Sequence, residues 1–209
     1  MPTRIVIFAK APLPGRVKTR LIPALGAEGA ALLARRMLRD TLREAVKVNV
    51  AEIELCTDPE PCHADWRDLL PPAAAAAQGG GDLGERLARA AERVTAEGSK
   101  VVFIGTDCPA MNERRLRDAC RELEGHDAVI NPTFDGGYAL LGLQRFHPSL
   151  FSDIEWSTGS VGRTTIGRIG ALGWSLHLGA TLQDIDQPAD LTPDLMPPRS
   201  PTDRDASSG

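Results

Sequence analysis

The hydrophobic positions of the chain fall into short apolar runs that alternate with longer amphipathic segments. The short runs predict strands at residues 4–9, 50–56, 100–105, 127–131, 138–143 and 174–178. Between them, apolar residues recur at helical spacing and predict helices at residues 27–48, 83–97, 112–124 and 158–172. Apolar strands that alternate with helices are typical of a mainly parallel sheet covered on both faces. We therefore predict an α/β fold.

Some segments of this pattern are less regular. Residues 58–72 predict a loop with a short helix around Trp66. The alanine run at residues 73–77 is ambiguous, because alanine favours a helix whereas the run is short and lies between a proline and a glycine. Asn112 and Thr158 stand where helical patterns begin, and we expect both to act as N-caps.

No internal repeat or change in composition marks a boundary between domains. We therefore predict a single domain over residues 1–196. Residues 197–209 lack apolar periodicity and predict a disordered tail.

The overall composition excludes several classes of function. A formal net charge of -4 argues against a general nucleic-acid-binding protein, which is usually basic. No apolar run approaches the roughly 20 residues of a membrane span, and the N-terminus enters a strand without a signal-peptide pattern. The four cysteines form no CxxC pair, so we expect reduced thiols in a cytoplasmic protein. The oligomeric state stays open.

The loop after the first strand is the most informative part of the chain. It carries four basic side chains and no acidic one, namely Lys10, Arg16, Lys18 and Arg20. Gly15 lets the backbone of this loop come close to a ligand. Because ligands of open α/β sheets bind beyond the carboxyl ends of the strands, this loop predicts a site for a phosphate or diphosphate. The alternative is that these are solvated surface charges.

Carboxylates follow two of the later strands. Asp107 ends the apolar strand at 100–105, and a divalent ion such as Mg²⁺ would keep it from repelling a phosphate. Asp184 or Asp186 could supply a second carboxylate, and we expect the carboxylates of Asp107 and Asp186 to lie within roughly 4–6 Å of each other. Alternatively, Asp107 is a turn residue and Asp186 caps a short helix.

Two glycine-containing segments are further candidates. Gly136 and Gly137, between Asp135 and Tyr138, could form a hairpin turn or let a ligand approach the backbone. Asp135 could then orient or deprotonate a hydroxyl group. Glycines 79, 81 and 84 match GxGxxG, but they follow the alanine run and not the first strand, which argues against a dinucleotide site. They could still hold a nucleotide phosphate at the start of a helix.

The remaining candidates are weaker. Trp156 could be a lid or a core aromatic residue. The four histidines show no metal-ligand spacing, and nothing beyond residue counts supports a Ser-His-Asp triad.

Taken together, these motifs resemble a known family. They lie at residues 7–21, 81–87, 104–109, 135–138, 156–158 and 184–188, so the resemblance spans about residues 4–192. In this order they resemble the bacterial glycosyltransferase-A-like family DUF2064, some of whose members are described as arsenosugar-biosynthesis glycosyltransferases. The layout is more distantly similar to nucleotidylyltransferases that act on molybdopterin, methylerythritol phosphate or phospholactate.

This resemblance implies the fold of nucleotide-diphospho-sugar transferases, a Rossmann-like αβα sandwich. It implies that Arg16, Lys18 and Arg20 hold phosphates and that Asp107 binds Mg²⁺ or Mn²⁺, with Asp186 as the second ligand ahead of Asp184. The segment around residues 78–84 would contact the nucleotide. The nucleotide-binding residues that we expect are Lys10, Gly15, Arg16, Lys18, Arg20, Gln78, Gly81, Asp82 and Gly84. Those expected to bind the substrate are Gly136, Gly137, Tyr138 and Trp156.

The sequence also departs from the pattern of glycosyltransferases with this fold. They carry Asp-x-Asp, whereas Thr106-Asp107-Cys108 supplies one carboxylate. This departure favours a metal arrangement like that of nucleotidylyltransferases.

On the basis of the resemblance, the leading hypothesis is a metal-dependent transferase that transfers a glycosyl group from a nucleotide-activated substrate to a small-molecule acceptor. Lys18 and the metal would neutralise the leaving diphosphate, while Asp135 activates the acceptor. The alternatives are a nucleotidylyltransferase that uses a nucleoside triphosphate and a non-catalytic domain that senses nucleotides.

Overall fold

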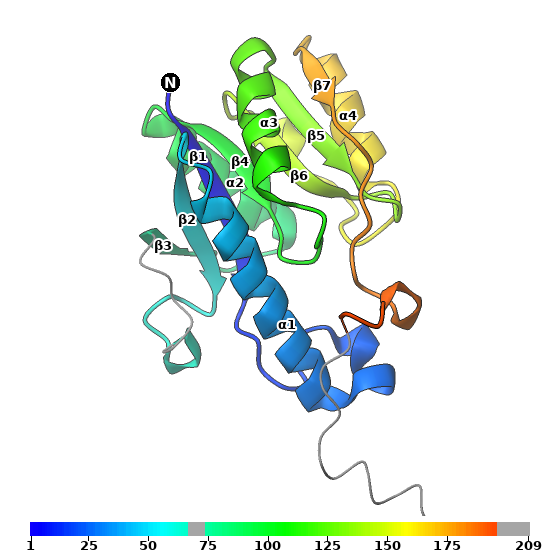
Figure 1. Ribbon diagram of the computed structural model, residues 1–209. Coiled ribbons are helices and arrows are strands. Elements are labelled where there is room, and N and C mark those ends of the chain that lie inside the picture. Colours follow the sequence, from blue (N-terminus) through cyan, green and yellow to red (C-terminus); the bar gives the residue numbers. More distant parts are fainter. Residues whose placement is uncertain (67–73, 196–209) are drawn as a thin grey trace, which may run out of the picture.

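A seven-stranded sheet in the order β3-β2-β1-β4-β6-β5-β7 forms the centre of the computed structural model, which describes residues 1–66 and 74–195 (Figure 1). The strands are β1 (Thr3–Lys10), β2 (Ala51–Asp58), β3 (Ala74–Ala77), β4 (Lys100–Ile104), β5 (Ala128–Pro132), β6 (Tyr138–Leu143) and β7 (Leu176–Leu178). Strand β6 is antiparallel to both β4 and β5, and the other pairings are parallel. The predicted α/β fold with a mainly parallel sheet is confirmed.

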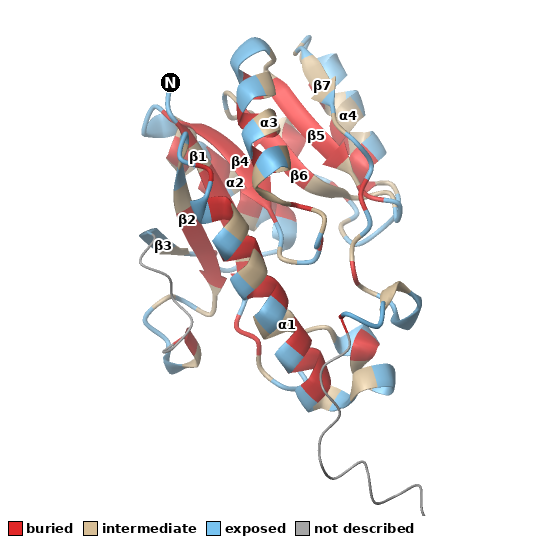
Figure 2. Ribbon diagram, viewed as in Figure 1, coloured by how far each residue is buried: buried red, intermediate tan, exposed pale blue. Residues whose placement is uncertain are grey.

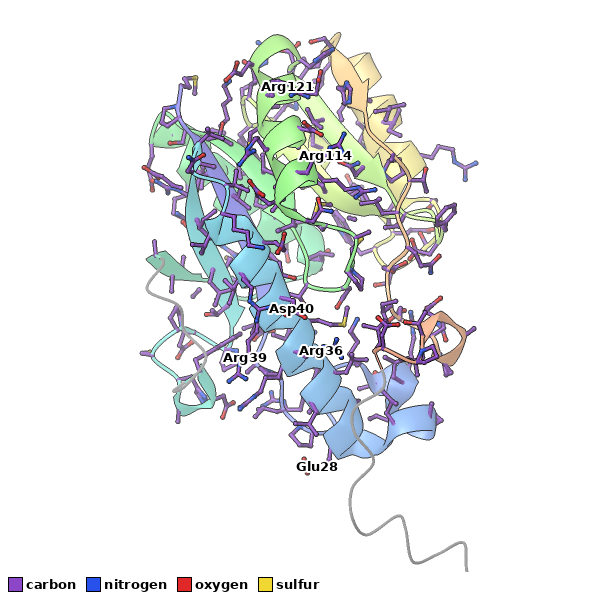
Figure 3. All side chains as sticks on the ribbon, in the orientation of Figure 1. Glu28, Arg36, Arg39, Asp40, Arg114 and Arg121 are labelled. Atoms are coloured by element: carbon purple, nitrogen blue, oxygen red, sulfur yellow. The ribbon has the colours of Figure 1, made fainter. Side chains whose placement is uncertain are left out.

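In the described part of the chain, four α-helices cover the two faces of this sheet. They are α1 (Ile22–Val46), α2 (Leu83–Ala96), α3 (Glu113–Gly125) and α4 (Val161–Ala171). Alternate residues of one strand point to opposite faces. Val102 therefore packs with α1 and α3, whereas its neighbours Val101 and Phe103 pack with α2 and α4. Figure 2 shows the buried strands between these layers, and Figure 3 shows charged side chains along the outer sides of α1 and α3.

Of the two predicted N-caps, the structure confirms that of α3. The side chain of Asn112 accepts a hydrogen bond from the backbone N–H of Arg115, so the expected N-cap of α3 is confirmed. The expectation for Thr158 is wrong. Ser160 is the N-cap of α4, and Thr158 instead donates its hydroxyl to the carbonyl of Glu155. Helix α1 begins at Ile22, earlier than predicted, and is kinked at Gly26.

The alanine run resolves as a strand. Ala74–Ala77 pairs with β2 in parallel register, from Glu54↔Ala74 to Thr57↔Ala77. The free edge of β2 decides this conformation, because pairing there overrides the helical preference of alanine. Trp66 is fully buried in the predicted short helix, Ala64–Trp66. Residues 67–72 of the predicted loop and the predicted tail at 197–209 lie outside the described residues.

The strand directions bring the candidate segments to one edge of the sheet. Because β6 is antiparallel to both β4 and β5, these two strands run in the same direction as β1. The loops after β1, β3, β4 and β5 therefore all leave at the carboxyl edge, where ligands of such sheets bind. Among the described residues, none of the helices is long and apolar enough to cross a membrane.

Candidate active site

Lys18 connects the cationic loop to both acidic segments. Its Nζ lies 2.6 Å from Oδ1 of Asp107 and donates a hydrogen bond of 2.5 Å to the carbonyl of Ile185. The Lys18 side chain is 6% exposed, whereas that of Asp107 is 56% exposed. Lys18 also has a left-handed backbone conformation, with φ 48°. A buried ammonium group thus holds an accessible carboxylate at the carboxyl edge.

The segment around Asp186 returns to Asp107, as expected from the parallel sheet. The backbone N–H of Ile185 donates a 2.8 Å hydrogen bond to the carbonyl of Asp107. Arg20 forms an ion pair with Asp186. The alternative that Asp186 caps a helix is wrong, because Gln187 is the N-cap of the short helix Pro188–Asp190. The Asp186 carboxylate is therefore available to cations.

The other two cations of the loop are exposed. Lys10 is the last residue of β1, and Arg16 follows Gly15, which has a positive φ of 75°. Within residues 1–66 and 74–195, neither Lys10 nor Arg16 has an ion-pair partner. Two positive charges thus remain free beside the two that already contact carboxylates.

Asp184 adds a third carboxylate to this edge. Burial raises its pKa, and the nearby charges of Asp135 and Asp186 raise it further. Such mutual repulsion is relieved when a cation binds between carboxylates. The donors here are carboxylate and carbonyl oxygens, which suit Mg²⁺ or Mn²⁺. In the described part of the chain, however, the aspartates do not form a group of three whose oxygens lie within 4.8 Å of one another.

The turn before β6 brings Asp135 to the same edge. Oδ1 of Asp135 accepts hydrogen bonds from the Thr133 hydroxyl at 2.5 Å and from the backbone N–H of Gly137 at 3.0 Å. The predicted hairpin turn between β5 and β6 is confirmed. A Cβ atom on Gly136, whose φ is +90°, would overlap the carbonyl of Gly159. The space beside Gly136 is therefore occupied by the backbone of Gly159.

The sequence and structure comparisons identify the family. The family model described as "Uncharacterized protein conserved in bacteria (DUF2064)" matches residues 41–158. A solved structure from Desulfovibrio desulfuricans G20, described as a candidate nucleotide-diphospho-sugar transferase, is 33% identical and superposes with a TM-score of 0.82. That match covers 90% of this chain and 84% of the other. The chain belongs to the DUF2064 family.

The match of the DUF2064 model contains Asp107 and Asp135 but ends before Asp186 and begins after the cationic loop. Two further structures share the fold. One is a CMP-2-keto-3-deoxy-manno-octonic acid synthetase complexed with CTP, 12% identical, with a TM-score of 0.58 over 90% of this chain and 95% of that one. The other is Rv0371c of Mycobacterium tuberculosis H37Rv complexed with manganese, 16% identical, with a TM-score of 0.50 over 91% and 96%. No curated protein matches the sequence.

In this DUF2064 chain, the glycine-rich loop after β3 is tied to the sheet by its own polar groups. The buried amide of Gln78 donates to the carbonyls of Ala9 and Cys56, at 3.0 and 2.9 Å. Asp82 caps α2 through the backbone N–H of Glu85. These contacts position the loop and leave its backbone at the carboxyl edge.

Arg86 is a cation at this edge that sequence reasoning did not single out. It contacts the Asp58 carboxylate at 2.9 Å, the Gly81 carbonyl at 2.9 Å and the amide oxygen of Gln78 at 3.2 Å. The sequence feature that could have identified Arg86 is its position near the start of the helix that follows the glycines.

Tyr138 and Trp156 are partly buried and pack against the core on the α2 and α4 side of the sheet. The Tyr138 hydroxyl and the indole N–H of Trp156 are buried and have no hydrogen-bond partner among the described residues. Burial raises the pKa of Tyr138. A Cβ atom on Gly84 would overlap the Trp156 indole, so the start of α2 packs directly on this ring. The position of Trp156 agrees with the core alternative.

The fold brings together two histidines that lie far apart in the sequence. Glu122, His126 and His177 each offer a ligand atom within 4.8 Å of the others, and they are the one such group in residues 1–66 and 74–195. The spacing between Glu122 and His126 is four, as on one helix face, but His177 comes from β7 and only the fold brings it there.

Proposed function

We propose that this chain is a divalent-metal-dependent transferase that acts on a nucleotide-activated substrate, with glycosyl transfer from a nucleotide-diphospho-sugar as the leading reaction. The observation that carries the proposal is the position of Lys18 between Asp107 and the Ile185 carbonyl. Through Lys18, the cationic loop after β1, which suits a phosphate, contacts the Asp107 carboxylate, which suits a metal ion, at the carboxyl edge of the sheet. The related protein described as a candidate nucleotide-diphospho-sugar transferase supports the same class.

In this proposal, Lys10 and Arg16, which have no ion-pair partner in the described part of the chain, make the first contacts with the phosphates. Lys18 and Arg20 then exchange their carboxylate partners for phosphate oxygens, and Lys18 stabilises the charge of the leaving diphosphate. Gly15, Gln78, Gly81, Asp82 and Gly84 shape the surface that receives the nucleotide.

Asp107 and Asp186 would hold Mg²⁺ or Mn²⁺, with Asp184 beside them. The donor set fits a hard cation, and a distant structural neighbour is complexed with manganese. When bound, such an ion supplies charge neutralisation to the phosphates.

We place the acceptor near the turn at Asp135, Gly136 and Gly137, with Tyr138 and Trp156 behind it. Oδ1 of Asp135 is held by Thr133 and Gly137, which leaves Oδ2 to accept a proton or a hydrogen bond from an acceptor hydroxyl. A cavity of about 390 Å³ adjoins this turn and includes Arg163 of α4 in its lining.

A second candidate function is nucleotidyl transfer. The single carboxylate in Thr106-Asp107-Cys108 favours it, and a structural neighbour is complexed with CTP. Release of pyrophosphate from a nucleoside triphosphate would separate this reaction from glycosyl transfer. A nucleotide-sensing domain would bind nucleotides without turnover of any acceptor.

The experiment is a thermal-shift screen of nucleotides and nucleotide-sugars with and without Mg²⁺ or Mn²⁺. A ligand that binds the native state raises the melting temperature by mass action. We expect one nucleotide class to stabilise the wild type more with the metal than without it. The proposal fails if no nucleotide or nucleotide-sugar raises the melting temperature under either condition.

A further inference from the structure

Glu122, His126 and His177 meet on the opposite side of the domain from the candidate active site. Glu122 lies in the last turn of α3, His126 is its C-cap, and His177 is the middle residue of the edge strand β7. Figure 1 shows this end of α3 beside β7, away from the loops at the carboxyl edge, and Figure 3 labels the adjacent Arg121. The proposed function uses none of these side chains.

The three side chains are close enough to share one ion. Each offers one ligand atom, and these atoms all lie within 4.8 Å of one another; Oε2 of Glu122 lies 3.4 Å from Nδ1 of His177. The two imidazole rings are 5.5 Å apart at an angle of 60°. Each side chain is about one third exposed, at 31%, 35% and 35%, so an ion can enter from solvent.

A backbone hydrogen bond fixes the orientation of His126. Its Nδ1 lies 2.9 Å from the carbonyl oxygen of Glu122. A carbonyl oxygen only accepts hydrogen bonds, so Nδ1 carries the hydrogen and Nε2 keeps its lone pair. Histidines that bind metals typically donate their second ring nitrogen to a carbonyl or carboxylate in this way.

The carboxylate is oriented as well. Oε2 of Glu122 faces the two imidazoles, while Oε1 lies 3.8 Å from the guanidinium of Arg121. One oxygen is thus left for an ion on the histidine side.

We propose that Glu122, His126 and His177 bind a first-row transition-metal ion, with Zn²⁺ as the best fit. Two imidazoles and one carboxylate are ligands that Zn²⁺ prefers, and a water molecule can take the fourth position. Mg²⁺ prefers a shell of oxygen ligands, so this site differs in chemistry from the Asp107 region. The ion would tie the end of α3 to β7, which otherwise joins the sheet only through β5 in the described residues.

The test is a calorimetric titration of the metal-free, full-length chain with Zn²⁺ in excess Mg²⁺. The variants are Glu122→Gln, His126→Gln and His177→Gln. A matched control is the double variant Cys62→Ser with His63→Gln. Cys62 and His63 are exposed and offer an alternative binding site for Zn²⁺ that the control removes. We expect one ion per chain in the wild type and in the control. Each of the three variants should weaken binding by at least about 10-fold, because even loss of a supporting residue costs 10–100-fold.

Co²⁺ absorption and histidine NMR give independent readouts on the wild type. Two of the four histidines should shift on addition of Zn²⁺, and the visible Co²⁺ spectrum should vanish in the His126 and His177 variants. NMR of the wild type keeps the test valid if a variant does not fold. The proposal is overturned if the wild type binds no Zn²⁺, if the three variants bind as tightly as the wild type, or if binding is lost in the Cys62/His63 control.

Discussion

Replacing Lys18 by alanine tests the centre of the proposed active site. The change removes the ammonium group that contacts Oδ1 of Asp107 and donates to the carbonyl of Ile185. In the wild type, this nearly buried group is the cation that we expect to move onto a substrate phosphate. The variant therefore loses a phosphate ligand and leaves Asp107 without its ion-pair partner.

The expected magnitude follows from these contacts. A hydrogen bond between a charged donor and an oxygen acceptor contributes about 1.5–3 kcal/mol. The existing ion pair with the half-exposed Asp107 offsets part of this, since exposed pairs contribute about 0.2–1 kcal/mol. We therefore expect nucleotide binding to weaken by about 0.5–2.8 kcal/mol, or roughly 2- to 110-fold in Kd.

The assay is isothermal titration calorimetry with the nucleotide that the thermal-shift screen identifies, in the presence of Mg²⁺ or Mn²⁺. Lys47→Ala is the matched control, because Lys47 pairs with Glu44 at the end of α1, far along the chain from the site. Circular dichroism melts show whether each variant is folded. Unchanged affinity in folded Lys18→Ala would refute the assignment of Lys18, and an equal loss in Lys47→Ala would show that the effect is a general one of charge.

Three further variants test separate parts of the structure. Asp107→Asn should abolish the Mg²⁺ or Mn²⁺ dependence of nucleotide binding while the protein stays folded, and calorimetry with and without the metal would detect a retained response. Gly136→Ala should lower the free energy of unfolding by about 1–3 kcal/mol in urea denaturation, because the new Cβ meets the Gly159 carbonyl at a positive φ. Asn112→Ala should lower it by about 1 kcal/mol through loss of the α3 cap, and an unchanged urea midpoint would contradict that role.

Local patterns in the sequence were sufficient to predict that a sheet is covered by helices on both faces. The strand at 100–105 has an apolar run at residues 101–104 because Val101, Val102 and Phe103 are buried on both faces of the sheet, which is typical of a covered, mainly parallel sheet. The return of Ile185 to Asp107 could be predicted for a related reason. Parallel strands release their following loops at the same edge, so the direction of the strands alone placed these segments together.

Other features depend on partners that no local pattern contains. The alanine run is a strand because β2 offers it a free edge, and Thr158 lost its predicted role because its hydroxyl bonds to the Glu155 carbonyl. His177 meets Glu122 across 55 positions of sequence, since 177 − 122 = 55. The glycine at 136 was open to two interpretations, and the contact with Gly159 assigns its small size to backbone packing.

If the proposed function holds, the charges at the carboxyl edge predict that the metal and the nucleotide bind together. Lys18 and Arg20 already neutralise Asp107 and Asp186, so a metal ion alone would displace or face two cations. A nucleotide phosphate alone would draw these cations away and leave the carboxylates unpaired beside it. When both enter, the phosphates take the cations and the metal takes the carboxylates, and every charge keeps an opposite partner. Coupling of this kind is reciprocal, so the factor by which Mg²⁺ or Mn²⁺ strengthens nucleotide binding must equal the factor by which the nucleotide strengthens metal binding. Calorimetric titrations in both orders measure the two factors, and independent binding of the two ligands would contradict this arrangement of charge.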